Sequence, residues 1–367
     1  MKNLTIVFLI LVFSKVSVAE KLDLETHSSL IQKLESVVSL DSKASMVSQV
    51  ELAHRLADLY AERARLLSLE EEGKGDQIHK VQIKSDRQKS LKLLSQILEA
   101  LKSSEKGAAL MQMAHLYSLL EQPDMAFKIY TRIQTNPKLF DARTVALAEV
   151  QLGDIAFLKG DLKKSQEHFE RALKNKDNPR KGYSHFRLAW IHFNQGQTQL
   201  AEKILTSLLK TPSLMKNGKG TTDLSFQEEA SHDLATFMAS NGINKQSVST
   251  LSSLSPENTR KKNLVYLATE LDRTGKKSSA LIVWNVIGTH ELSFEDQLER
   301  QIHITRIQYD LGNKTQILKE IDSSIALLKS SACNQNEDCV VGKQNFRRII
   351  TDWGKAEERL PSQELTL

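Results

Sequence analysis

Few residues of the chain stand in spacings that are typical of catalysis or metal binding. The segment Asn217–Thr221 resembles a phosphate-binding loop, but it lacks the upstream glycine and the preceding strand that such a loop needs. Ser207 and Lys210 match a Ser-x-x-Lys pair without its companion motifs. His185 and His192 lie seven residues apart, with no carboxylate or thiol at ligand spacing beside them. We therefore predict no enzymatic activity, no cofactor, no metal site and no small-molecule substrate.

The chain has only two thiols, Cys333 and Cys339, which lie six residues apart in a segment rich in Ser, Asn and Asp. In an exported protein, such a pair most simply forms one disulfide. A disulfide that closes a loop of this length lowers the conformational entropy of the unfolded chain and so stabilises the fold by about 2 kcal/mol. A redox-active pair is the alternative, although that function usually needs a Cys-x-x-Cys spacing at a helix start.

Four aromatic side chains share one face of a predicted helix, at spacings of three, four and three residues: Tyr183, Phe186, Trp190 and Phe193. The other face carries His185, Leu188 and His192, which we assign to the core. A helix with two large apolar faces buries one face and presents the other to a second surface. Two interpretations stay open: the aromatic face binds a partner protein, or it packs on neighbouring parts of the chain.

This helix belongs to a repeating pattern. One unit runs from Leu152 to Ala172: a helix that contains the small Gly153 stops at Gly160, and a second helix follows. A small residue in the first helix is followed, twelve positions later, by a small residue in the second. The interval recurs in four units, as Ala114–Ala126, Gly153–Ser165, Ala189–Ala201 and Ala268–Ala280.

This order resembles the tetratricopeptide repeat, a helix-turn-helix unit of about 34 residues. The resemblance covers residues 106–329 and predicts six hairpins, of which the fourth and sixth are degenerate: 107–138, 141–176, 180–211, 225–255, 256–290 and 293–329. It implies an all-α fold, a right-handed α-solenoid that binds protein partners through its concave surface. Residues 187–196 and 228–235 are in addition similar to repeat proteins of bacterial envelope and gliding machineries.

The repeat register suggests which side chains line that surface. His115 and Asp154 fall at the positions that match Trp190 in the two preceding hairpins, and Asn194 follows Phe193. The predicted partner-binding set is therefore Tyr183, Phe186, Trp190, Phe193, Asn194, Asp154 and His115. The Lys and Asn residues with which some family members clamp a free C-terminal carboxylate are not found at the matching positions. A basic run at Lys174, Lys176, Arg180 and Lys181 reads as solvated helix ends.

Longer helices precede the repeats. Residues 44–72 and 78–101 each carry an apolar stripe, and Gly73–Asp76 separates them, so residues 20–105 are predicted to form a long helical hairpin that caps the solenoid. A short intermolecular coiled coil is the alternative. Residues 330–367 are expected to hold the disulfide loop and a helix over 345–359.

The first nineteen residues read as a secretory signal peptide. Lys2 precedes an apolar run from Leu4 to Phe13, and Ser17-Val18-Ala19 offers the small side chains that a signal peptidase requires. We expect cleavage after Ala19, a periplasmic location and no membrane insertion afterwards. A formal charge of +5 on 367 residues, which cleavage lowers further, does not favour nucleic-acid binding.

The whole sequence therefore predicts an exported, non-catalytic scaffold or adaptor that binds one or more proteins of the cell envelope. A content of only 15 glycines and 6 prolines agrees with a helical fold. Two alternatives stay open. One is the helical adaptor part of a cell-wall-processing enzyme, and the other is an envelope-stability factor that assembles through a coiled coil.

Overall fold

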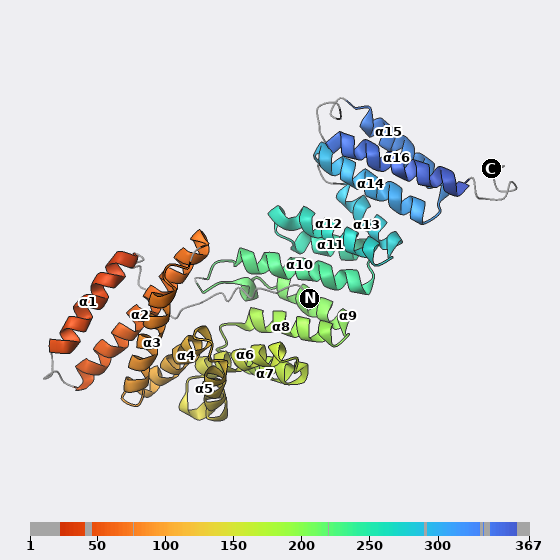
Figure 1. The fold of residues 1–367 in the computed structure, drawn as a ribbon. Coiled ribbons are helices and arrows are strands. Elements are labelled where there is room, and N and C mark those ends of the chain that lie inside the picture. Colours follow the sequence, from red (N-terminus) through yellow and green to blue (C-terminus); the bar gives the residue numbers. More distant parts are fainter. Residues whose placement is uncertain are drawn as a thin grey trace. The chain divides into compact units, whose positions relative to one another are not determined.

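In the computed structural model, the described part of the chain is built from α-helices joined by short connections (Figure 1). The structure describes residues 23–357 except 41–45, 76, 219, 290–291, 331–332 and 334–337. The predicted signal peptide and its cleavage site lie outside these residues. The chain divides into two compact units, residues 1–191 and 192–367, and each is described by itself.

Helices α2 (Met46–Lys74) and α3 (Lys80–Ile97) occupy the segment in which the N-terminal helical hairpin is predicted. Helix α2 ends next to Gly75, whose φ of 71° lies in the left-handed region that favours glycine. Helix α3 is shorter than predicted. An additional helix, α1 (Leu24–Leu40), packs on α2 and was not predicted. The Asp23 carboxylate accepts a hydrogen bond from the Thr26 backbone N–H at 2.7 Å, which fixes the start of α1.

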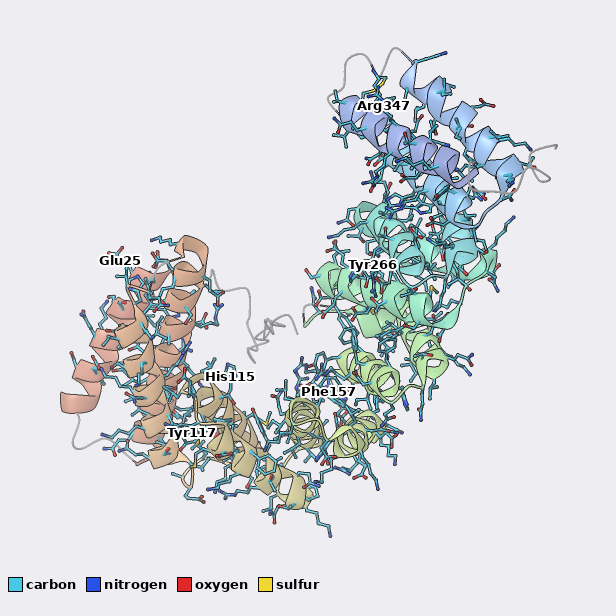
Figure 2. All side chains as sticks on the ribbon, turned by 45° about the vertical axis from the view of Figure 1, so that its right-hand side comes forward. Glu25, His115, Tyr117, Phe157, Tyr266 and Arg347 are labelled. Carbon is cyan, nitrogen blue, oxygen red and sulfur yellow. A yellow bond between two sulfur atoms is a disulfide. The ribbon has the colours of Figure 1, made fainter. Side chains whose placement is uncertain are left out.

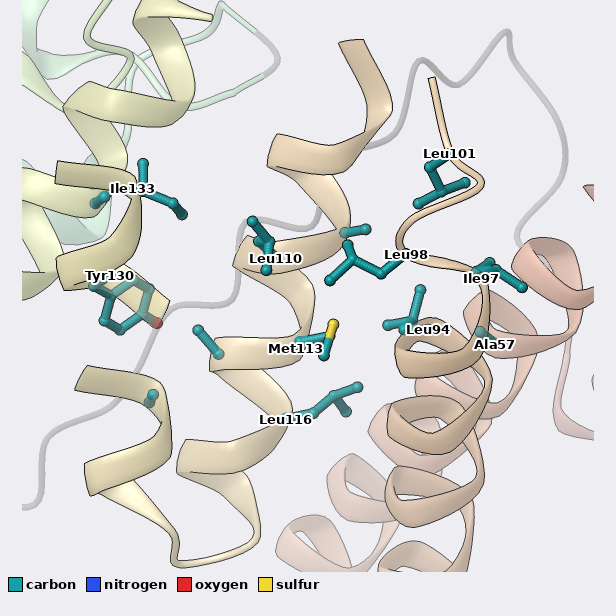
Figure 3. Close-up of a cluster of buried hydrophobic side chains, with 14 of the residues drawn as sticks. Ala57, Leu94, Ile97, Leu98, Leu101, Leu110, Met113, Leu116, Tyr130 and Ile133 are labelled. Atoms are coloured by element: carbon teal, nitrogen blue, oxygen red, sulfur yellow. The ribbon is translucent and has the colours of Figure 1, made fainter. Parts of the chain in front are cut away.

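A shared apolar core joins these helices to the first hairpin, α4 (Ser103–Leu119) and α5 (Pro123–Thr135). In Figure 3, Leu110, Met113 and Leu116 of α4 lie between side chains of α3 and of α5. Leu94 of α3 and Ile133 of α5 are fully buried in this cluster. The N-terminal helices therefore hold the first helix of the repeat region in place.

The second hairpin pairs α6 (Ala142–Leu158) with α7 (Leu162–Lys174), after the short 3₁₀ helix η1 (Pro137–Leu139). Gly153 lies directly against the Phe169 ring, since a Cβ atom added to it would stand 2.8 Å from Phe169 Cε2. The Ser165 hydroxyl donates a buried hydrogen bond of 2.8 Å to the Gly153 carbonyl. These contacts confirm the close approach of the two helices that the small residues predict.

Helix α8 (Lys181–Asn194) begins in the first unit and ends in the second. The second unit continues with α9 (Thr198–Leu209), the 3₁₀ helix η2 (Pro212–Met215), α10 (Leu224–Asn241), α11 (Lys245–Leu254), α12 (Glu257–Arg273), α13 (Lys277–Ile287), α14 (Phe294–Asp310), α15 (Lys314–Leu328) and α16 (Asp338–Glu357). The connection between α9 and α10 contains η2, whose Met215 is buried.

The C-terminal helix begins earlier than expected. Helix α16 starts at Asp338, seven residues before the predicted Asn345, and so includes Cys339. Cys333 and Cys339 are both 2% exposed and are paired as a disulfide, with their Cα atoms 5.4 Å apart. The disulfide therefore tethers the first turn of α16 to the segment after α15.

Five of the hairpin turns share one backbone geometry: three residues link the helices, and the middle residue has a positive φ. Glycine fills this position in four turns, at Gly160, Gly196, Gly275 and Gly312. In the α4–α5 turn the same position is Glu121, with a φ of 61°. A residue with a Cβ atom is sterically strained in this conformation.

We expect Glu121→Gly to raise the free energy of unfolding by about 1 kcal/mol, because the exchange removes the steric cost of a Cβ atom in this conformation. The Glu121 side chain is exposed, so little packing is lost. Urea unfolding measures the change. The reverse exchange in the next hairpin, Gly160→Glu, is the matched control and is expected to destabilise. A Glu121→Gly protein no more stable than wild type would contradict the argument.

Candidate protein-binding site

The candidate site in the first unit is a polar and aromatic cluster on α6, on α8 and at the residue just before α8. We call it the Asp154 cluster; it consists of Asp154, Phe157, Arg180, Tyr183 and Arg187. The buried side of α8 positions it, because Leu188 and Ile191 pack against Val150 of α6 and Phe169 of α7. Tyr183 and Phe157 lie half-buried at the edge of this core.

Asp154 is the centre of the cluster. Its Oδ1 atom accepts a hydrogen bond of 2.8 Å from the Tyr183 hydroxyl and lies 3.0 Å from Arg187 Nε. The Arg187 Nε–H does not point at this oxygen well enough to form a hydrogen bond, so the contact is an ion pair only. Asp154 is 7% exposed, and the Arg187 side chain is 16% exposed.

Two guanidinium groups flank the aromatic rings. The Arg180 guanidinium carbon lies 4.0 Å from the centre of the Tyr183 ring, and the Arg187 carbon lies 4.0 Å from the centre of the Phe157 ring. Arg187 also stands 5.9 Å from the Tyr183 ring. Such stacking favours a cation over the ring face and leaves the N–H edges of the guanidinium available.

Burial dominates the electrostatics of Asp154. It raises the pKa of the carboxyl above its ordinary value, although Arg187, the Tyr183 hydroxyl and Arg180 each act in the opposite direction. Burial and the neighbouring Asp154 together raise the pKa of Tyr183, so its hydroxyl stays protonated as the donor. The fold thus holds a carboxylate whose charged form costs stability.

A neutral side chain at position 154 is expected to change how stability depends on pH. Folding raises the pKa of Asp154, so the folded protein binds this proton more tightly than the unfolded chain does. The resulting stabilisation is fully present below the unfolded-state pKa of about 3.9, and it is lost as the pH rises through the folded-state pKa. Asp154→Asn is neutral at every pH. Wild type is therefore expected to lose stability relative to this variant between acidic and neutral pH. Urea unfolding of both proteins across that range measures the difference; a difference that does not vary with pH would refute the assignment.

The structure brings together only some of the predicted site residues. Tyr183 and Asp154 are in direct contact. His115 lies half-buried on α4 (Figure 2), where burial and then the nearby Arg87 lower its pKa. Trp190 is half-buried on α8.

Two predicted residues serve packing. Phe186 is 5% exposed, so its expected place on an open binding surface is wrong; the helix is buried on this side as well. Phe193, in the second unit, stacks on Phe237 of α10 with ring centres 4.4 Å apart and planes 17° apart. Asn194 is exposed at the end of α8.

Sequence reasoning missed the cationic part of the cluster. Arg180 was interpreted as part of a solvated helix end, but it lies just before α8 and stacks on Tyr183, three residues further along the chain. Arg187 follows Tyr183 by four residues, and Phe157 follows Asp154 by three. These helical spacings were the available signal.

The two histidines considered as metal ligands do not form such a site. The assignment of His185 and His192 to the core was only approximate, because both are half-buried; His192 Nδ1 lies 2.7 Å from Gln197 Oε1. Within the described residues, no three His, Cys, Asp or Glu side chains are arranged to hold a metal ion. Over the same residues, no helix combines the length and the apolar character that crossing a bilayer requires.

The consecutive antiparallel helix pairs, sealed by small residues, define a helical-hairpin repeat protein. Models of the tetratricopeptide repeat match residues 150–179 and 183–212, which contain the Asp154 cluster except Arg180. These two segments are similar to the tetratricopeptide repeat, and the predicted all-α solenoid class is confirmed. A search of curated proteins found no match.

Several solved structures are similar to the chain. Tetratricopeptide-like repeats of a kinesin light chain from Podospora anserina are 16% identical, over 57% of this chain and 95% of theirs, with a TM-score of 0.38. Yeast Tom70 is 12% identical, over 93% of this chain and 61% of its own, with a TM-score of 0.41. A chain of the Naa15/Naa10 complex bound to HypK is 12% identical, over 93% of this chain and 59% of its own, with a TM-score of 0.35. Matches this distant indicate neither a partner nor an activity.

Proposed function

We propose that the chain is an exported, non-catalytic scaffold that binds a partner protein of the cell envelope through the Asp154 cluster and the neighbouring Trp190. Tetratricopeptide repeats support a protein-interaction role in general. The observation that favours this particular surface is the buried Asp154, which is held between Tyr183 and Arg187 at a cost to stability.

The composition of the surface suits protein recognition. Tyr, Trp and Arg are the residues that most often dominate the binding energy of protein interfaces. Here the Tyr183 hydroxyl and both guanidinium groups are oriented by contacts within the chain. A partner therefore meets side chains that have already lost much of their freedom, which lowers the entropic cost of binding.

Site-specific photocrosslinking tests this proposal in the producing cell. A photoreactive residue at position 190 is expected to capture one discrete partner, and the same residue at the exposed position 167 on α7 is the control. Tyr183→Phe and Arg187→Lys, each combined with the photoreactive residue at position 190, should weaken capture of the partner. The thermal midpoint of unfolding should stay close to that of the wild type. Arg171→Lys, which alters an arginine paired with Glu149, should leave capture unchanged. Equal capture from positions 190 and 167 would overturn the proposal.

Export is the second element of the proposal, and it rests on residues 1–19 of the sequence. The mature protein is expected to begin at Glu20 and to appear in the fraction released by osmotic shock. N-terminal sequencing checks this point. A protein that still starts at Met1 would contradict export without affecting the binding surface.

A further inference from the structure

A second surface feature lies in the second unit, where α15 and α16 meet. It is an open groove of about 280 Å³. Phe346 of α16 is 2% exposed and forms its floor, and Leu328 of α15 and Ile350 of α16 form its apolar sides. Lys343 and Arg347, which lie one turn apart on α16, also line the groove, and both are exposed. The groove therefore combines an apolar interior with a basic rim.

An apolar stripe on α15 continues the groove. Its four side chains share one side of the helix, at spacings of three, four and three residues: Leu318, Ile321, Ile325 and Leu328. Leu318 is 50% exposed, and Ile325 is 40% exposed. Ser324, on the adjoining side of α15, is 1% exposed, and its hydroxyl lies 3.2 Å from that of Thr305 of α14. Helix α15 therefore packs on α14 with one side and exposes apolar side chains next to it.

The second hairpin shows what covers the equivalent position elsewhere in the chain. Ser165 of α7 and Ile317 of α15 hold the same place in their hairpins, and Leu173 and Ile325 follow them by eight residues. Leu173 is partly buried, because it packs on the core cluster to which α8 contributes Leu188. Ile325 is exposed instead. Since the chain covers one of these positions with a helix of its own, a helix is the shape that fits the other.

The charges around the groove are mainly positive. Arg347 lies on the exposed side of α16 (Figure 2). Within the part of the chain that the structure describes, no carboxylate pairs with Lys343 or Arg347. Helix α15 and the residue after it add three exposed charges next to the stripe in sequence, Lys319, Asp322 and Lys329, of which two are positive. A helix that enters the groove therefore meets cations along one edge.

We propose that the groove and the α15 stripe bind an amphipathic helix of a partner protein, whose apolar face is edged by Asp or Glu. Its apolar side chains would lie on Leu318 and Ile325, and its carboxylates would reach Lys343 and Arg347. Helices bind such grooves through apolar side chains at i, i+3, i+4 and i+7 spacing. A second copy of the chain is disfavoured, because it would bring the same cations to the interface. The proposal does not depend on the function proposed for the Asp154 cluster.

Fluorescence anisotropy with labelled helical peptides tests the proposal on the purified protein. The probe is a stapled helix of about three turns, the length of the α15 stripe, with leucines along one face and glutamates beside them. One matched peptide carries lysines in place of the glutamates, and another keeps the composition but scatters the leucines around the helix. The glutamate peptide is expected to bind most tightly. Lys343→Glu combined with Arg347→Glu should weaken its binding about fivefold or more and should strengthen binding of the lysine peptide.

Two further variants make the result specific to this surface. Lys84→Glu combined with Lys203→Glu makes the same change of charge at exposed positions on α3 and α9, and it should leave binding unchanged. Leu318→Gln combined with Ile325→Gln removes the exposed apolar side chains of the stripe, and it should weaken binding of the glutamate peptide. The thermal midpoint of unfolding should stay close to that of the wild type, because neither side chain is buried.

Three results would overturn the proposal. The first is a glutamate peptide that does not bind, or that binds no more tightly than the peptide with scattered leucines. The second is an equal loss of binding in the two charge-reversed double variants. The third is self-association of the wild-type protein that Leu318→Gln with Ile325→Gln abolishes, because it would assign the surface to a second copy of the chain.

Discussion

Replacing Asp86 with alanine is expected to lower the free energy of unfolding by about 3–5 kcal/mol, because the change leaves a buried arginine without its counter-charge. Asp86 of α3 is fully buried and receives two hydrogen bonds of 2.7 Å from Arg63 of α2, through Nε and Nη2. Gln82 donates a third bond of 2.8 Å. The Arg63 side chain is 13% exposed, so water replaces little of what is lost.

Urea unfolding of the variant measures this effect, and two comparisons give it meaning. Glu99→Ala removes one carboxylate from an exposed ion pair with Lys106 and should change stability little. Arg63→Met combined with Asp86→Leu replaces the whole pair with apolar side chains, and it should destabilise less than Asp86→Ala alone. If Asp86→Ala proved as mild as Glu99→Ala, the pair would not be holding α2 to α3.

The ion pair matters beyond the N-terminal helices. Leu94 and Ile97 of the same α3 face Leu110 and Met113 of α4 in the shared core (Figure 3). A displaced α3 would therefore shift the first hairpin as well. Repeat proteins transmit stability chiefly between neighbouring elements, so the effect should fade along the hairpins that follow.

The hairpins were predictable from the sequence because local signals specify them. The interval of twelve between Gly153 and Ser165 places two small residues opposite each other, and the structure joins them by a hydrogen bond. The Asp161 carboxylate accepts a hydrogen bond from the Lys164 backbone N–H and so starts α7. Each signal lies within one hairpin.

Contacts between distant segments were not predictable in the same way. The pairing of Arg63 with Asp86 depends on the register of α2 against α3, which apolar spacing alone leaves undetermined. Helix α1 was not predicted although Asp23 offers a cap, because its apolar side chains are buried only by packing against α2. Both features needed three-dimensional packing to become visible.

The candidate site shows the same limit. The repeat register placed Asp154 and Tyr183 among the binding residues, but not their contact across 29 positions of sequence. Helical spacing grouped Phe186 with Tyr183 and Trp190, yet Phe186 is buried while the other two side chains are half-buried. Three- and four-residue spacing defines a face of the helix; it does not say whether that face is covered.

Gly153→Leu is expected to lower the free energy of unfolding by about 3 kcal/mol, because the new side chain has no room. The Phe169 ring, which is fully buried, already lies within 3.0 Å of the position that a Cβ atom would take. Gly73→Leu is the matched control: Gly73 lies in α2 with nothing within 4 Å of an added Cβ atom, so this change should preserve or raise stability. Combining Gly153→Leu with Phe169→Ala should recover part of the loss, because the smaller side chain frees the space that leucine occupies. Urea unfolding of Gly153→Leu, Phe169→Ala and the double variant would measure this coupling, beside the Gly73→Leu control. Additive effects of the two substitutions would mean that α6 and α7 do not pack through these residues, and the register that places Asp154 one position further along α6 would then be wrong as well.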